Sequence, residues 1–243
     1  YMRMLMGGGW MFRGGGPTPG QVMVGRAIAR VTESRNDAFA KGDLVVGGFG
    51  WQTHAVSDGG NIDFRISPRD GVPLSAYLGA CGNSGTTAWS GLKLIGDPKP
   101  GETVLVSAAA GSVSSVVGQL AKEWGCRAVG IAGGPEKCAV VTDEFGFDAC
   151  CDYKADGLTD QISAAAPDGI DVYFDNVGGE MLDGIMPLLN NYARVPVCGV
   201  LSQYNADGDW QGVRNTRLIF DKRLRLQGFL QSDYKDHAAE ARA

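Results

Sequence analysis

The chain has 243 residues and a formal net charge of −5, with 44% hydrophobic and 20% charged residues. This composition is typical of a globular protein with a sizeable core, and the negative balance without a cluster of Lys and Arg argues against nucleic-acid binding. No apolar run is long enough to cross a membrane, and residues 2–12 are interrupted by three glycines and lack the layout of a signal peptide. We therefore expect neither a nucleic-acid partner nor a membrane partner.

The cysteine and histidine pattern favours a reduced, metal-free protein. The six cysteines form no C-x-x-C pair and lie at positions 81, 126, 138, 150, 151 and 198. Cys150 and Cys151 fall in an expected strand, so their side chains should face opposite ways. The chain has two histidines, His54 and His237, and we expect neither to join a cluster of Cys or carboxylate ligands that would hold a metal. We expect free thiols, a cytoplasmic location and no metal site.

The first part of the chain predicts a small antiparallel section. Residues 22–31 alternate loosely, residues 44–46 form a short apolar run, and residues 51–57 follow as a further extended segment. Residues 74–95 carry a helical pattern with a glycine break at 82–85. The turn cluster that follows, Asp97-Pro98-Lys99-Pro100-Gly101, is the best candidate for a domain boundary.

Beyond this turn, apolar runs alternate with helical stretches, which indicates βαβ units and a parallel sheet with helices on both faces. Strands are expected at 103–107, 127–132, 148–152, 170–175, 193–199 and 224–229, and helices at 112–124, 135–145, 157–165 and 179–189. The predicted fold class is α/β, with a doubly wound Rossmann sheet. Pro196 is unexpected within a strand, because proline cannot donate to a central ladder, and a bulge or an edge position there would accommodate it.

The segment 104–122 reads as a buried strand, a turn of small residues and a helix with one apolar face. Free backbone N–H groups at such a helix start favour an anion such as a pyrophosphate. The fingerprint G-x-G-x-x-G falls on Ala109, Gly111 and Ser114, so only its middle glycine is present. A core helix after an ordinary turn is the alternative for this segment.

Polar residues follow the other expected strands. NAD proteins carry an acidic residue directly after the second strand. In this chain the residues at that place are small and uncharged, and Lys137 follows them. A lysine there favours a 2′-phosphate and hence NADPH. Tyr153 follows the third strand, Asn176 the fourth and residues 198–204 the fifth. Each of these four features has a structural alternative, which is, in the same order, a solvated lysine, a half-buried tyrosine, a turn that caps a helix and a plain strand exit.

These motifs occur together, in one order, in a known family. They are Ala109-Ala110-Gly111, Gly118-Gln119, Glu136-Lys137-Cys138, Gly146-Phe147-Asp148, Tyr153-Lys154, Phe174 to Glu180, Cys198-Gly199 and Ser202 to Asn205. They closely resemble the zinc-independent medium-chain dehydrogenase/reductases, in the group of NADPH-dependent double-bond reductases that includes prostaglandin reductase, leukotriene hydroxydehydrogenase, curcumin reductase and the alkenal reductase of plants. Tyr1-Met2-Arg3, Gly42 to Val45 and Gly50 to Gly59 extend the resemblance, which covers nearly the whole chain.

The resemblance implies a domain plan. It assigns residues 1–97 to a partial GroES-like, β-rich substrate domain with a connecting helix, and residues 98–234 to the Rossmann domain. Residues 235–243 would begin a helix that returns to the substrate domain. Family members start earlier and end later, so the chain is expected to be truncated at both ends. Zinc enzymes of the wider superfamily carry Gly-His-Glu where this chain has Gly20-Gln21-Val22, which removes a metal ligand.

The resemblance also implies the cofactor contacts. The pyrophosphate turn corresponds to Gly111, Ser112, Val113 and Ser114, with Ser114 in place of a family glycine. Lys137 and Tyr153 correspond to the residues at the 2′-phosphate, and Asn176 to the fourth-strand asparagine. The stretch lining the nicotinamide ribose corresponds to Cys198, Gly199, Val200, Leu201, Ser202, Gln203 and Tyr204. The sixth-strand exit corresponds to Phe229, Leu230 and Gln231.

The activity implied is hydride transfer from NADPH to the β-carbon of an α,β-unsaturated ketone or aldehyde, followed by protonation of the enolate. Tyr204 is the candidate catalytic donor, because its phenol supplies an O–H without a charge. A quinone reductase and an NADPH-binding relative without turnover are the alternatives. The partners expected are a small unsaturated carbonyl substrate and a second copy of the chain, in a homodimer.

Overall fold

The computed structural model describes residues 18–205 and 212–243, and it divides between Gly82 and Asn83 into two compact units. Tyr1-Met2-Arg3, part of the sequence resemblance, lies outside the described residues. Within the described residues, no helix combines the length and apolar composition needed to span a bilayer. The helices of residues 83–96 belong to the second unit together with the parallel sheet.

The first unit is built on a three-stranded antiparallel sheet in the order β1-β2-β3. Its strands are β1 (Ala27–Arg30), β2 (Leu44–Gly47) and β3 (Ile62–Arg65), and a 3₁₀ helix, η1 (Leu74–Leu78), follows. Val46, Ile66 and Tyr77 form its buried apolar cluster. The predicted antiparallel section is confirmed, although β1 is shorter than the expected strand at 22–31. The expected extended segment at 51–57 is wrong, because no strand forms there and the third strand is β3.

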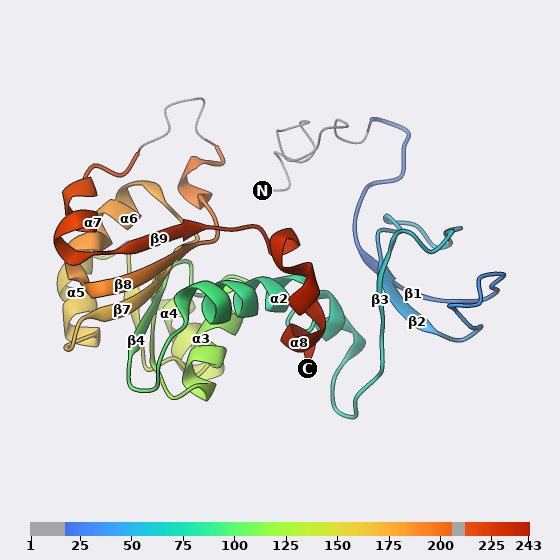
Figure 1. Cartoon of the computed structure of the whole chain (residues 1–243), viewed down its shortest axis with the longest axis horizontal. Coiled ribbons are helices and arrows are strands. Elements are labelled where there is room, and N and C mark those ends of the chain that lie inside the picture. The colour runs from blue at the N-terminus through green and yellow to red at the C-terminus, as the bar shows by residue number, and fades with distance from the viewer. Residues whose placement is uncertain (1–17, 206–211) are drawn as a thin grey trace. The chain divides into compact units, whose positions relative to one another are not determined.

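The second unit contains a six-stranded parallel sheet with the order β6-β5-β4-β7-β8-β9. Figure 1 labels four of its strands, β4, β7, β8 and β9. The strands are β4 (Thr103–Val106), β5 (Arg127–Ala132), β6 (Ala149–Asp152), β7 (Ile170–Phe174), β8 (Leu189–Val197) and β9 (Arg225–Gly228). The predicted doubly wound α/β sheet is confirmed. The strand order reverses between β4 and β7, and ligands of such sheets bind outside the carboxyl ends of the strands at this point.

Helices cover both faces of the sheet (Figure 1). One face packs against α2 (Asn83–Ser90), the π-helix η2 (Gly91–Gly96), α3 (Ser114–Glu123), α4 (Pro135–Ala139) and the π-helix η3 (Val140–Glu144). The other packs against α5 (Leu158–Ala165), α6 (Gly179–Ile185) and α7 (Thr216–Lys222). In β4, Val104 and Val106 enter the first apolar cluster and Leu105 enters the second, so the strand is buried on both faces.

Short helices complete this unit. They are η4 (Met186–Leu188), η5 (Leu201–Gln203), η6 (Gln231–His237) and α8 (Ala238–Arg242). In Figure 1, α8 lies beside α2, where the rings of Trp89 and His237 are 6.1 Å apart. The helical pattern expected at 74–95 is interrupted at residues 79–82, between η1 and α2, so the break includes Gly82, whereas Gly85 lies within α2.

Two glycines allow close packing of the first face. A Cβ on Gly118 of α3 would lie 1.9 Å from the ring of Phe147, which is almost fully buried. A Cβ on Gly130 of β5 would lie 2.7 Å from the Cβ of Ala109. These positions therefore hold α3 and the turn after β4 against the sheet at distances that only glycine permits.

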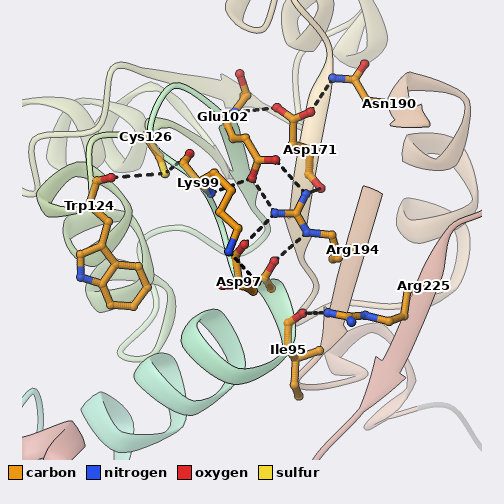
Figure 2. A network of polar contacts seen from close by, with 12 residues as sticks. Ile95, Asp97, Lys99, Glu102, Trp124, Cys126, Asp171, Asn190, Arg194 and Arg225 are labelled. Atoms are coloured by element: carbon orange, nitrogen blue, oxygen red, sulfur yellow. Dashed lines mark hydrogen bonds and ion pairs between the residues drawn. The ribbon is translucent and has the colours of Figure 1, made fainter. Parts of the chain in front are cut away.

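The amino-terminal edge of the sheet is tied together by Arg194 (Figure 2). Its guanidinium donates two hydrogen bonds to the carboxylate of Glu102, at 3.0 and 2.5 Å, and others to the carbonyls of Gly96, Asp97 and Asp171. The Arg194 side chain is mostly buried, with 17% of its surface exposed. Arg194 on β8 thus connects η2, the turn before β4 and the start of β7, on the edge opposite the carboxyl ends.

Pro196 does not sit on an edge strand, because β8 is flanked by β7 and β9. The edge position that the sequence left open is therefore excluded for this residue. The regular pairing of β8 with β7 reaches Arg194, and a single bridge between Asp175 and Val197 continues it. The carbonyl of Pro196 accepts the Asp175 N–H at 3.0 Å. The proline therefore lies beyond the end of the regular β7–β8 pairing, next to this single bridge.

Candidate functional site at the carboxyl ends of the strands

The turn between β4 and α3 is tight and partly strained. Ala108 has a φ of 51°, which is uncommon for a residue with a side chain. Buried Ala109 donates its N–H to the Ile131 carbonyl at 2.9 Å, and Gly111 donates to the Ala108 carbonyl at 2.8 Å. A Cβ on Gly111 would come within 3.0 Å of that carbonyl. The turn therefore brings the backbone of Gly111 and exposed Ser112 to the start of α3.

Ser114 is buried in the first turn of α3, where the dinucleotide fingerprint has its third glycine. Its hydroxyl donates to the Ser107 carbonyl at 3.0 Å and accepts a hydrogen bond from Asn176 Nδ2 at 3.1 Å. The same Nδ2 group donates to the Ser107 carbonyl at 3.1 Å. Ser114 therefore joins the ends of β4 and β7 to the start of α3, a role that glycine could not perform.

A buried carboxyl organises the exit of β7. Asp175 Oδ1 accepts hydrogen bonds from the Tyr173 hydroxyl at 2.9 Å and from the backbone N–H groups of Val177 and Gly178, both at 3.0 Å. The Ser107 hydroxyl lies 3.3 Å from the same oxygen. Burial raises the pKa of Asp175, and the hydrogen bonds from Gly178 and Val177 oppose that rise.

Sequence reasoning missed Ser107 and Asp175 as parts of this site. Ser107 also accepts the backbone N–H of Asn176 at 2.8 Å, and Asp175 fixes the backbone of the two residues that follow this asparagine. A polar residue ending an apolar strand was the available signal, because Asp175 directly follows Ile170–Phe174. The predicted site residue Asn176 depends on both of them.

The stretch after β8 lies against the β7 exit. Cys198 donates its N–H to the Asp175 carbonyl at 2.7 Å, and Leu201 donates to the Asn176 carbonyl at 3.0 Å. Ser202 reaches the Val177 carbonyl with its N–H at 3.1 Å and with its hydroxyl at 2.7 Å. The structure therefore brings residues 198–204 and Asn176 together, as the sequence predicted.

Gly199 and Tyr204 meet within this stretch. A Cβ on Gly199 would lie 3.2 Å from the Asn176 carbonyl and 3.4 Å from the hydroxyl of Tyr204. The phenol of Tyr204 thus lies close to the β8 exit, and a side chain at position 199 would require its neighbours to move by a few tenths of an ångström. Burial raises the pKa of the neighbouring Cys198 thiol to about 12, so this thiol is neutral at physiological pH.

Val200 and Gln203 complete the stretch, and the Gln203 N–H donates a hydrogen bond to the Val200 carbonyl at 2.8 Å.

A second group of predicted residues lies at the exits of β5 and β6. Gly134 donates its N–H to Asp152 Oδ1 at 2.7 Å, which ties the two strand ends together. A Cβ on Gly133 would touch the ring of Tyr153 at 2.8 Å, so this half-exposed ring lies over the β5 exit. Lys137 is exposed in α4, which begins at Pro135 directly after that exit. Lys137 and Tyr153 thus belong to neighbouring strand exits.

The residues after β9 have a different environment. The Phe229 side chain is buried in the first apolar cluster, and its ring meets that of Phe174 edge-on with centroids 6.3 Å apart. Leu230 is exposed and its N–H bonds Asp233 Oδ2 at 3.0 Å, while Gln231 starts η6. The Phe229 side chain thus packs in the core, and the backbone of Leu230 and Gln231 forms the exit.

Metal ligands do not gather in the described parts of the chain. Among residues 18–205 and 212–243, no three His, Cys, Asp or Glu side chains are placed to hold a metal ion. The segment Gly20-Gln21-Val22 carries none of these residue types. The donors present therefore do not fit a catalytic zinc.

Comparison with known proteins assigns the family. The family model described as zinc-binding dehydrogenase matches residues 112–242, and a second, described as the N-terminal domain of oxidoreductase, matches residues 1–64. The chain belongs to the zinc-binding dehydrogenase family. Its relatives lie in the double-bond reductase group of the medium-chain dehydrogenase/reductases, which confirms the resemblance drawn from the motifs.

The relatives include two curated reductases. The chain is 46% identical over 215 residues to the NADPH-dependent curcumin reductase of Escherichia coli (strain K12), covering 87% of this chain and 62% of that protein. It is 44% identical over 217 residues to the NADP(+)-dependent 2-alkenal reductase of Nicotiana tabacum, covering 89% and 63%. The chain thus spans less than two thirds of the length of these relatives.

A solved structure shows the same fold. CurA from Vibrio vulnificus, also solved in complex with NADPH, has a TM-score of 0.83 and 41% identity, covering 95% of this chain and 69% of that one. The quinone oxidoreductase of Escherichia coli has a TM-score of 0.70 at 21% identity, which supports the fold alone.

Proposed function

We propose that this chain is part of an NADPH-dependent reductase that reduces the carbon–carbon double bond of α,β-unsaturated ketones or aldehydes. The observation that carries the proposal is the placement of the predicted cofactor residues at the carboxyl ends of β4, β5, β6, β7 and β8, around the point where the strand order reverses. Curcumin and 2-alkenal reductases among the relatives, and the CurA complex with NADPH, support the cofactor and the reaction class.

The chain offers each part of NADPH a suitable group. Gly111 leaves room for a pyrophosphate close to the backbone, and the N–H groups of Ser112 and Val113 at the start of α3 can bind its oxygens. The ammonium of exposed Lys137 can pair with the 2′-phosphate, and the ring of Tyr153 can lie against the phosphate or the adenine. The positions directly after β5, where an NAD protein carries an acidic residue, hold Gly133, Gly134 and Pro135, and the nearby Asp152 carboxylate from β6 is engaged by the Gly134 N–H.

When bound, NADPH supplies the hydride for the reduction. Asn176, held by Ser107 and Ser114, and residues 198–204 would orient the nicotinamide end of the cofactor. The Tyr204 hydroxyl, beside Gly199, would donate a hydrogen bond to the substrate carbonyl or to the ribose. A neutral donor can stabilise negative charge that develops on the carbonyl oxygen without itself being charged in the resting site.

The assay follows NADPH absorbance with a simple enone, an alkenal and a quinone, using protein expressed from the complete reading frame. Faster turnover of the enone and alkenal than of the quinone supports the proposal. Turnover restricted to quinones makes the protein a quinone reductase, and tight NADPH binding without any turnover makes it a binding protein. Tyr204→Phe should lower kcat with the affinity for NADPH largely intact if the hydroxyl serves the substrate carbonyl, and should weaken NADPH binding if it serves the ribose.

We also propose that the protein is a cytoplasmic homodimer. Relatives that are named as NADP-dependent reductases support a small-molecule partner, and light scattering on the purified protein measures the number of chains. A molecular mass equal to one chain would contradict the homodimer. Fractionation of the source cells tests the location.

A further inference from the structure

Two cysteines that the reductase chemistry does not use face each other beside the Lys137 site. Cys138 lies on α4 and Cys150 on β6, and the S–H of Cys150 points to Cys138 Sγ at a sulfur–sulfur distance of 3.0 Å. All six cysteines of the chain are free thiols. A disulfide bond has a sulfur–sulfur length of about 2.05 Å, so a movement of roughly one ångström would bring the pair to bonding distance.

The other cysteines have different surroundings. Cys151 points to the opposite face of the sheet, where it is fully buried in the second apolar cluster. Buried Cys126 donates its S–H to the Lys99 carbonyl at 3.3 Å, near the amino-terminal edge. Cys138 and Cys150 are only partly buried and pack together on the first cluster, so a small oxidant can reach them.

We propose that Cys138 and Cys150 form a reversible intramolecular disulfide on exposure to a peroxide. The Cys138 sulfur, on losing its proton, attacks one peroxide oxygen, which breaks the O–O bond and leaves a sulfenic acid on Cys138 and a hydroxide, and the released proton converts that hydroxide to water. The Cys150 sulfur then attacks the Cys138 sulfur, forming the S–S bond as the sulfenic oxygen leaves as a second water. The two thiols lose two electrons and two protons, and hydrogen peroxide accepts them.

The order of attack follows from the contacts. Burial, with the hydrogen bond to Cys138, raises the pKa of the Cys150 thiol, so Cys150 is the less reactive of the two at the first step. In the second step the Cys150 proton passes to the sulfenic oxygen as the S–S bond forms. The S–H of Cys150 points to the Cys138 sulfur, which places the Cys150 sulfur beside the one that is oxidised first. A small thiol, such as dithiothreitol, reverses the bond by exchange.

The disulfide would act on the cofactor site, and this part rests on the proposed function. Cys138 directly follows Lys137, and Cys150 lies on the same short strand as Asp152, after which Tyr153 follows. Drawing Cys138 toward β6 shifts the first turn of α4, which carries the lysine proposed to bind the 2′-phosphate. We therefore expect the oxidised protein to bind NADPH several-fold more weakly than the reduced protein, and NADH to be affected less.

The experiment treats the protein expressed from its complete reading frame with hydrogen peroxide, blocks the remaining thiols with a maleimide and maps disulfides by mass spectrometry. The expected result is one crosslinked peptide that joins Cys138 to Cys150, lost on reduction with dithiothreitol. Cys138→Ser should abolish it, and Cys126→Ser, on the same apolar cluster, should leave it unchanged. Free Cys138 and Cys150 after treatment, or crosslinks that join other cysteines, would overturn the proposal.

NADPH affinity is then measured on the reduced and the crosslinked protein. Equal affinities would show that the disulfide forms without acting on the cofactor. A reduced protein that binds no NADPH would instead contradict the proposed function while leaving the disulfide itself supported by the peptide map.

Discussion

The side-chain amide of Asn176 is bonded to Ser114, the residue that stands in place of a fingerprint glycine. Asn176 Nδ2 donates to Ser114 Oγ and to the Ser107 carbonyl, at 3.1 Å each, and Ser114 donates to that same carbonyl at 3.0 Å. The serine is almost fully buried. Ser114, which replaces the glycine of the fingerprint, thus links β4, α3 and β7 by hydrogen bonds.

Replacing Ser114 should destabilise the second unit. In Ser114→Ala the Asn176 amide keeps one of two acceptors, and the expected loss in the free energy of unfolding is about 1–2 kcal/mol, as for a buried hydrogen bond. Chemical denaturation measures it, with Ser112→Ala as a control at an exposed serine. A double-mutant cycle with Asn176→Ala should show strong coupling, and additive losses would disprove the link.

Gly118 should not tolerate a side chain. A Cβ at this position would overlap the buried ring of Phe147, so Gly118→Ala should lower the free energy of unfolding by about 1–3 kcal/mol, as overpacking does. Gly184→Ala is the matched control, because it also lies in a helix but its Cβ would meet nothing within 4 Å. The control should be neutral or stabilising by about 0.5–1 kcal/mol. Equal effects of the two substitutions would contradict the packing argument.

The Glu102–Arg194 pair predicts a loss of stability in acid (Figure 2). Burial opposes ionisation of Glu102, but the hydrogen bonds from Arg194 and from the Lys99 N–H outweigh it, and the pKa of this carboxyl is lowered. A lowered pKa in the folded state means that the pair's contribution is present above the unfolded value of about 4.3 and is lost as the pH falls further. Denaturation at several pH values measures this loss.

Glu102→Gln should make that pH profile shallower below about pH 4.3, because it removes the titrating group. It should also lower the free energy of unfolding at neutral pH by about 1–3 kcal/mol, since Arg194 then lies mostly buried without its carboxylate. Glu144→Gln removes an exposed carboxyl instead and should keep the parent slope. If both variants share one profile, the pair does not control the acid response.

Lys137→Ala tests the choice of cofactor. Losing the ammonium should weaken the binding of NADPH by about 1.5–3 kcal/mol, as for a charge-assisted hydrogen bond, and that of NADH much less. Calorimetry or fluorescence titration with both cofactors measures the difference. Lys99→Ala, at the opposite edge of the sheet, removes another exposed lysine and should leave the ratio of the two affinities unchanged. Equal losses for NADPH and NADH would refute the phosphate role of Lys137.

Much of the second unit could be read directly from hydrophobic runs. The expected strands at 103–107, 127–132 and 170–175 agree with β4, β5 and β7 to within a residue at each end. Buried parallel strands are continuous apolar runs, so their pattern is visible without a neighbour. The expected strand at 193–199 was less accurate, because β8 begins earlier, at Leu189, through polar and exposed residues whose pairing is not encoded locally.

The candidate site was predicted in part. Asn176 and residues 198–204 were placed at strand exits from the order of elements alone, and the structure brings them together. Ser107 and Asp175 were missed, because neither belongs to a recognisable spacing and their role arises from contacts between strands far apart in the chain. Pro196 was judged from the general rule for strands, and only the local ladder shows how an interior strand accommodates it.

By itself, the sequence determined that the chain alternates strands and helices, that its second half forms a parallel sheet, and that small and polar residues follow successive strands. These properties depend on the order and periodicity of side chains along one segment. Only the tertiary structure decided that Ser114 bonds Asn176 and that Cys138 faces Cys150. Each of these contacts joins residues from different elements, and their distances are set by how closely α3 and α4 pack on the sheet.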